Sequence, residues 1–239
     1  MRYFNEFEIL KDVISNNIDV EKHLDKISKN DIIKNLMKKK YIPLSQDFFV
    51  SYDVMEDKNW ALLPQKIKDE IMTIYKDLES KNPVDLKRLI DLSKIYPNVP
   101  SIYNYITVYY FLTGNREQQY ETILKTIKKF PDYLFAKISL ADYYKYNDME
   151  DKIFDAYGGK LDIYLIKPNK ENKYHITEIR GFYHNVAVYY LYKNKLDEAL
   201  LCYCLFREID KDHRSTKDLG ERIFAHIVGK IKDKMRKII

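Results

Sequence analysis

Residues 214–239 carry a regular pattern of hydrophobic and polar positions. Apolar residues recur at steps of three and four, at Leu219, Ile223, Phe224, Ile227, Val228, Ile231 and Met235. That spacing aligns them in one stripe along a helix, while Lys230, Lys234 and Lys237 occupy the polar face. The pattern predicts an amphipathic C-terminal helix whose apolar stripe packs on the preceding helices and closes the end of their stack.

An internal repeat precedes this helix and is marked by doubled tyrosines, each followed by a turn signal. The doubled tyrosines are Tyr109 and Tyr110, Tyr143 and Tyr144, and Tyr189 and Tyr190. The step from Tyr110 to Tyr144 equals the step from Pro97 to Pro131. Two independent landmarks therefore give one period, which predicts stacked helix pairs.

The third unit is displaced from this period. Tyr190 follows Tyr144 at a longer step, which exceeds one period by about a dozen residues. The surplus falls where turn-forming residues cluster, at 158–159 and 168–169. An insertion near residues 158–178 is therefore expected between the second unit and the third.

Each unit is predicted to contain two helices that pack through a small residue flanked by larger apolar ones. In the first helices these positions hold Tyr103, Ile106, Thr107 and Tyr110, then Leu140, Ala141 and Tyr144, then Tyr183, Val186, Ala187 and Tyr190. In the second helix of the third unit, Ala199 and Tyr203 face the partner helix. The arrangement over residues 100–211 resembles the tetratricopeptide repeat family, with a degenerate half-repeat expected over 84–97. It departs from the family pattern at Gln119, Thr126 and Lys137.

The resemblance implies an all-α fold, a right-handed solenoid of antiparallel helix pairs (tetratricopeptide-like). An N-terminal helical cap and the C-terminal amphipathic capping helix would close its two ends. Three parts are expected along the chain: a short-helix region over 1–63, the repeats with their insertion over 64–213, and the capping helix over 214–239.

In the N-terminal part, short helices are expected over 4–14 and 31–37, and a break at 42–44 interrupts them. The run Lys38–Lys40 is expected to be a solvated helix end. Trp60 is the expected anchor that packs this region against the first helix pair, because an isolated tryptophan is most often part of a core.

The family resemblance also implies a binding surface, because there the first helix of each unit lines a groove that takes a peptide or a helix of another chain. Carried over position by position, this groove consists of Asn104, Val108, Phe111, Ile138, Asp142, Lys145, His184, Val188 and Leu191. It is largely apolar. Phe111 and Leu191 are therefore expected to anchor a partner, because burying about 100 Å² of apolar surface is worth roughly 2.5 kcal/mol. In an alternative arrangement the insertion near 158–178 folds over the groove and fills it.

Composition restricts the class of protein further. Hydrophobic residues form 46% of the 239 residues and charged residues 32%, which excludes a mainly disordered chain. The net charge of +5 is spread along the sequence rather than gathered in a basic arm. The N-terminus lacks a signal-peptide pattern and no apolar run is long enough for a membrane span, so we expect a cytoplasmic protein.

Residues suited to catalysis or metal binding show no recognised spacing. The five histidines are His23, His175, His184, His213 and His226. They do not follow a zinc-binding pattern, and no glycine loop suited to phosphate is present. Cys202 and Cys204 lie within a predicted helix, where core packing is expected rather than a disulfide or a nucleophile. We therefore expect no metal, no cofactor and no enzymatic activity, and predict a protein that binds another protein or peptide.

Other classes stay open as alternatives. A nucleic-acid-associated protein would use the lysine-rich terminal helix together with Lys38–Lys40, and its affinity would fall steeply with salt. An enzyme would need a polar pocket near His175, Glu178 and His184. The terminal helix could also lie on a membrane surface, although it has no tryptophan to support that placement.

Overall fold

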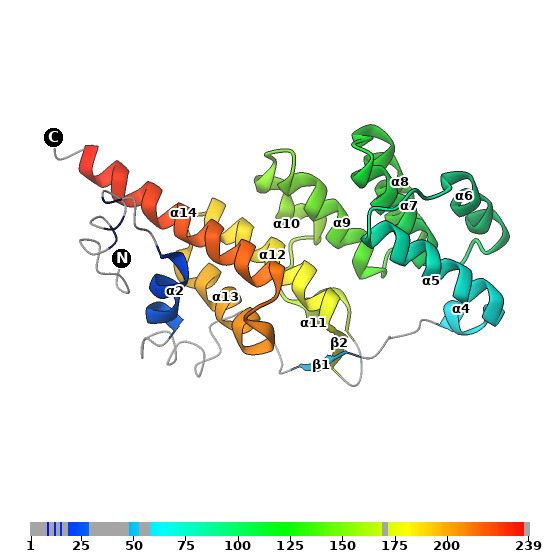
Figure 1. The fold of residues 1–239 in the computed structure, drawn as a ribbon, viewed down its shortest axis with the longest axis horizontal. Helices are drawn as coiled ribbons and strands as arrows, with labels where there is room; N and C mark the ends of the chain where they lie inside the picture. The colour runs from blue at the N-terminus through cyan, green and yellow to red at the C-terminus, as the bar shows by residue number, and fades with distance from the viewer. Residues whose placement is uncertain are drawn as a thin grey trace. The chain divides into compact units, whose positions relative to one another are not determined.

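The computed structural model describes residues 9, 12, 15, 19–28, 48–52, 58–168 and 172–236. Over these residues the chain is mostly helical with almost no sheet, which confirms the expected all-α class (Figure 1). Within the same residues, no helix has the length and apolar character needed to cross a membrane. The helices expected over 4–14 and 31–37, the break at 42–44 and Lys38–Lys40 lie outside this description, apart from residues 9 and 12.

The chain forms two compact units. The middle unit is Asp47–Ile179, and the terminal unit combines Met1–Gln46 with Arg180–Ile239. This division follows contacts, whereas the three-part division expected from the sequence follows the repeat pattern.

The middle unit is built from consecutive helices with one short strand near each of its ends (Figure 1). Its elements are β1 (Phe49–Ser51), α4 (Lys58–Ala61), α5 (Gln65–Glu79), α6 (Leu86–Ile95), α7 (Pro100–Leu112), α8 (Arg116–Lys129), α9 (Leu134–Lys145), the 3-10 helix η1 (Glu150–Lys152), α10 (Ile153–Ala156), α11 (Ile163–Ile166) and β2 (Lys173–His175). Helix α12 (Ile176–Tyr192) begins in this unit and continues into the terminal unit. Each helix from α6 to α9 packs on the next, α9 also packs on α10, and α7 contacts both α5 and α9.

The first helices of the repeat end in the same turn. Its distinctive residue has a positive φ and is Gly114 at 74°, Asp148 at 56° and Asn194 at 58°. The next residue along donates its N–H to the carbonyl five positions back, at 2.9, 2.9 and 2.8 Å respectively. In each case that carbonyl belongs to the second tyrosine of the doubled pair, namely Tyr110, Tyr144 or Tyr190. The repeat read from the sequence is therefore present in the backbone hydrogen bonds.

The second helices also end alike. The N–H of Tyr96 bonds the carbonyl of Leu92 at 2.8 Å, and one period later the N–H of Phe130 bonds the carbonyl of Thr126 at 2.8 Å. A proline follows each of these residues in the sequence and cannot continue the helix. Local backbone hydrogen bonds therefore define where the first helix and the second helix of the repeat end.

A further helix pair precedes the three units found by sequence. In the turn that follows helix α5, Lys81 has a φ of 56°, and the N–H of Asn82 donates to the carbonyl of Asp77 at 2.8 Å. This is the same turn as that at Gly114, nearly one full period earlier. The half-repeat expected over 84–97 is therefore the second helix of a pair whose first helix is α5. Arg88 of α6 holds Glu70 of α5, with Nη2 and Oε2 separated by 2.7 Å.

Trp60 is buried in the core at the start of the middle unit. It packs in one cluster with Leu63, Ile71, Leu92, Val99 and Ile102. This cluster joins α4 to the first helix pair and to the start of α7, which confirms that Trp60 is a core residue. Its role as the anchor of the whole region over 1–63 stays a prediction.

The strands add a feature that the sequence did not predict. Phe49–Ser51 pairs in parallel with Lys173–His175, and Tyr174 is fully buried.

The terminal unit consists of α2 (Val20–Ser28), the part of α12 from Arg180 onward, α13 (Leu196–Asp210) and α14 (Arg214–Arg236). Helix α14 packs on α13 and on α2. The predicted apolar stripe is buried at Leu219, Ile223, Phe224, Ile227 and Ile231. The amphipathic prediction is confirmed for the described part of this helix, and the stripe is already covered by protein.

Helix α2 docks on α13 and α14 at a glycine. A Cβ at Gly220 would lie 2.8 Å from Cδ1 of Leu24 and 3.1 Å from Cε2 of Tyr203. Beside it the ring of His23 stacks on Phe224 with centroids 5.6 Å apart. The close approach of α2 therefore requires the absence of a side chain at Gly220.

Replacing Gly220 by alanine should weaken this docking. We expect Gly220→Ala to lower the free energy of unfolding by about 1–3 kcal/mol, the usual cost of overpacking. Gly229→Ala in the same helix is the matched control, because apart from the chain neighbours and the backbone of the same helix no described atom lies within 4 Å of a Cβ there. The control should raise stability by up to about 1 kcal/mol through helix propensity. Urea unfolding followed by circular dichroism measures both, and equal shifts in the same direction would contradict the docking geometry.

Candidate interaction surface

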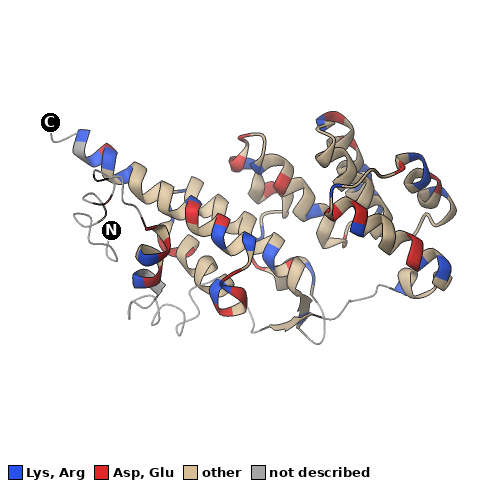
Figure 2. Ribbon diagram, viewed as in Figure 1, with Lys and Arg blue, Asp and Glu red and all other residues tan. Residues whose placement is uncertain are grey.

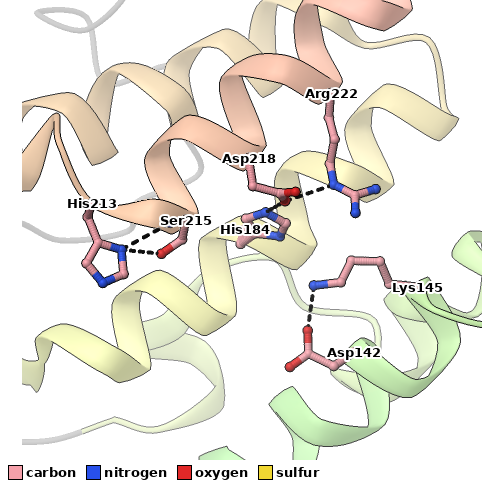
Figure 3. A network of polar contacts seen from close by, with 7 residues as sticks. All are labelled: Asp142, Lys145, His184, His213, Ser215, Asp218 and Arg222. Atoms are coloured by element: carbon pink, nitrogen blue, oxygen red, sulfur yellow. Dashed lines mark hydrogen bonds and ion pairs between the residues drawn. The ribbon is translucent and has the colours of Figure 1, made fainter. Parts of the chain in front are cut away.

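Helices α7 and α9 are neighbouring first helices of the repeat, and they contact each other directly. The hydroxyl of Ser139 donates to Oδ1 of Asn104 across this contact, at 3.3 Å. Further along α9, Nζ of Lys145 donates to Oδ1 of Asp142 at 2.6 Å (Figure 3). The predicted positions on each helix follow one another at steps of four and three, which places them along one face.

This face is partly exposed. Ile138 and Lys145 are buried, with 5% and 8% of their surface exposed. The other four predicted residues on these two helices are half-buried, namely Asn104, Val108, Phe111 and Asp142. These four therefore keep surface that a partner could contact.

The face ends in a group of aromatic rings and cations. The rings of Phe111 and Tyr146 are tilted, with centroids 5.4 Å apart. The guanidinium carbon of Arg116 lies 5.0 Å from the centroid of Phe111, and Nζ of Lys145 lies 4.7 Å from that of Tyr146. Leu112 follows Phe111 and is 40% exposed, and Tyr146 is 49% exposed. We call Phe111, Arg116 and Tyr146 the ring platform.

The sequence singled out only Phe111 of the ring platform. Leu112 and Tyr146 carry a signal of their own, because they lie one period apart and both are large apolar residues at the end of a first helix. Tyr192 holds the same position in the third repeat and is also 49% exposed. A residue next to a turn is normally read as part of the turn, so the pattern alone did not place these three on a surface.

The third predicted set, on α12, is buried. His184, Val188 and Leu191 are 6%, 5% and 8% exposed, so each offers little surface to a partner. A groove that continues through all three repeats stays a prediction. The predicted groove residues that are half-buried lie on α7 and α9.

His184 is committed to a cluster within the terminal unit. Its Nε2 lies 2.8 Å from Oδ2 of Asp218, which also accepts a hydrogen bond from Nε of Arg222 at 2.9 Å (Figure 3). The hydrogen bond from His184, with further support from Arg222, holds the pKa of the Asp218 carboxyl well below its usual range. The cluster joins α12 to α14 and holds the ring of His184 on a carboxylate of the terminal unit.

Two other histidines, His175 and His213, cap the N-termini of helices. Nδ1 of His175 accepts the N–H of Thr177 at 3.3 Å at the start of α12, and Glu178 Oε2 accepts the N–H of His175 at 3.2 Å. Nδ1 of His213 accepts the N–H of Ser215 at 3.1 Å at the start of α14 (Figure 3). Each ring therefore acts as a helix N-cap, a role usually taken by Ser, Asp or Asn, and the first of them forms a capping box.

The remaining residues suited to chemistry have structural surroundings. Cys202 and Cys204 are free and buried, as expected of core residues, and burial raises the pKa of the Cys204 thiol to about 12 and also raises that of Cys202. A thiolate nucleophile is therefore disfavoured at both positions. Among the described residues, no group of three or more potential ligands comes together to hold a metal ion.

No protein-family model, curated protein or solved structure matches this chain. The resemblance to the tetratricopeptide repeat family therefore stays a prediction. Function has to be inferred from the repeat geometry and from the side chains that it leaves exposed.

The cap at His213 makes stability depend on pH. Burial, and then the charge of Arg180, lower the pKa of this histidine below its ordinary value, while Asp210 partly opposes the shift. The folded state then binds fewer protons than the unfolded state. The stabilising contribution is complete above the unfolded pKa of about 6.5 and is lost as the pH falls through the folded value.

We therefore expect His213→Asn to flatten the dependence of unfolding free energy on pH below about 6.5, because asparagine caps without titrating. His213→Ala is the comparison variant. It should flatten the same curve but lie about 1 kcal/mol below the asparagine variant at every pH, because alanine cannot cap the helix. Urea unfolding across a pH series measures this, and curves for both variants parallel to the parent's would show that His213 does not titrate between the two states.

Proposed function

We propose that this chain is a non-catalytic scaffold that binds a segment of another protein along a tetratricopeptide-like stack of helix pairs. The observation that supports this is the repeated turn. Four first helices, α5, α7, α9 and α12, end in the same hydrogen-bonded geometry, at nearly equal steps apart from the longer one before α12. A helix pair repeated in this way cannot bury its apolar surface alone, and its stacked form presents a row of equivalent helices to a partner.

The partner surface in this proposal is the face of α7 and α9. Its polar groups are few and are matched in part among themselves, by Ser139 with Asn104 and by Lys145 with Asp142. Val108 and Phe111 are half-buried and supply apolar surface on the same face. Such a face suits a protein segment that buries side chains against it, and function on a general scaffold lies in these surface residues.

Nucleic-acid binding receives less support from the described residues. Basic residues gather toward the end of α14, at Lys230, Lys232, Lys234 and Arg236 (Figure 2). Even there Arg236 lies 3.8 Å from Asp233, and earlier in the helix Arg222 pairs with Asp218. One short basic end offers few phosphate contacts, so we place protein binding first.

The proposal is tested by mapping which face a partner contacts. A photo-crosslinking residue placed at Asn104 or Asp142 should capture a discrete partner, whereas one placed at Lys125 of α8, whose side chain is 75% exposed, should not. Equal capture from both faces would argue against a groove on the first helices.

The partner is then prepared pure and its affinity is measured by calorimetry. The double variant Asn104→Ala, Val108→Ala should weaken binding about tenfold or more, the effect of losing about 1.4 kcal/mol at an interface centre. Leu124→Ala on α8, where the leucine is 43% exposed, is the matched control and should leave the affinity unchanged. An unchanged affinity in the double variant, with an unaltered circular dichroism spectrum, would refute the proposed surface.

A further inference from the structure

One residue of the ring platform, Tyr146, holds a position that is exposed in each repeat, and this is the first step toward the partner's chemistry. Large hydrophobic residues exposed to solvent include Leu112, Tyr146 and Tyr192, which hold equivalent positions at the end of a first helix. Within the middle unit, the ring of Tyr146 contacts that of Phe111, whereas Leu112 follows Phe111 in one helix and does not share its face. The exposed ring of Tyr146 and the half-buried ring of Phe111 together form a small continuous apolar surface that another molecule can contact.

Arg116 differs from most arginines of the chain. Arg88, Arg180, Arg207, Arg222 and Arg236 each pair with a carboxylate of this chain. Arg116 instead donates from Nη1 to the neutral amide oxygen of Gln119 at 3.1 Å and lies over the ring of Phe111. It forms no ion pair within the described part of the chain, although Glu117 is its neighbour in sequence.

The charges around the platform leave Arg116 as the group that can receive a carboxylate. Lys145 already holds Asp142 at 2.6 Å, and only 5% of its side chain is exposed. Asp142 is thus already paired, while the guanidinium of Arg116 keeps donors for a ligand. A guanidinium held over a ring pairs well with a planar carboxylate, because its donors are already oriented.

We propose that the ring platform binds an acidic segment of a partner protein, with a carboxylate on Arg116 and an adjacent apolar side chain on Phe111 and Tyr146. This inference rests on the proposed scaffold function and names the chemistry of its partner. A single available guanidinium suits a carboxylate in a peptide, whereas a nucleic-acid backbone would require several cations in a row.

Three labelled peptides of equal length test the proposal with the full chain by fluorescence anisotropy. One alternates glutamate with leucine, the second lysine with leucine, and the third glutamate with serine. The first should bind at least about tenfold more tightly than the other two, because only it supplies both a carboxylate and an apolar side chain. Equal affinity for all three peptides, or binding of none, would overturn the inference.

Variants at the platform locate the binding. Arg116→Gln and Tyr146→Ser should each weaken the glutamate–leucine peptide about tenfold, and Arg116→Glu should shift the preference to the lysine–leucine peptide. The matched controls are Arg214→Gln, an exposed arginine also without an ion pair in the described residues, and Tyr192→Ser, whose tyrosine is 49% exposed, as is Tyr146. Loss of binding in the controls to the same extent would contradict the platform.

The two levels of proposal fail differently. If the groove variant Asn104→Ala, Val108→Ala weakens binding of the captured partner while the Arg116 and Tyr146 variants do not, the platform is wrong and the scaffold function stands. If none of these variants affects the partner, both proposals fall. Circular dichroism spectra that match the parent's are required of each variant, so that a loss of binding is not a loss of fold.

Discussion

The hydrogen bond that closes each first helix is the interaction on which the rest of the repeat depends. Its donor lies five residues after its acceptor, and a residue with positive φ lies between them, as at Gly114 and Asn194. This turn reverses the chain within a few residues and satisfies a carbonyl that the helix would otherwise leave unpaired. The second helix then returns along the first, so apolar side chains on both can be buried without a long connection.

The same bond explains which parts of the fold could be read from the sequence. The doubled tyrosines supply its acceptor, and the turn residues Gly, Asn and Asp tolerate positive φ, so both were visible as a pattern. The turn after α5 uses Lys81 and accepts at Asp77. Neither residue type announces such a turn, and the first helix of that pair was therefore missed although its geometry is the same.

Contacts between distant segments could not be predicted by any periodic signal. The strand pair joins two segments of three residues each, too short for an alternation to be recognised. Arg207 pairs with Asp25 across 182 residues of sequence, and α2 reaches its site because Gly220 lacks a side chain. A single glycine inside a helix predicts a close approach in general but does not identify the element that approaches.

On the candidate surface too, the sequence pattern predicts which residues share a helix face but not which distant residues they contact. Helical spacing was enough to place Asn104, Val108 and Phe111 along one face of α7, and the contact of Asn104 with Ser139 is consistent with that placement. The equivalent spacing on α12 selected His184, but a carboxylate much further along the chain, that of Asp218, holds its ring inside the terminal unit. Nothing in the sequence indicated that these two residues meet.

Equivalent positions of the repeats share a backbone conformation but need not share a function. Phe111, Lys145 and Leu191 occupy the same place at the end of three first helices. They are a half-buried ring, a buried cation and a buried aliphatic side chain, respectively. The turn constrains the backbone of this position and not its side chain, so the same backbone carries side chains of different charge and exposure. Specific binding by such a scaffold must then arise where the repeats differ, as Phe111 and Lys145 do in two successive repeats.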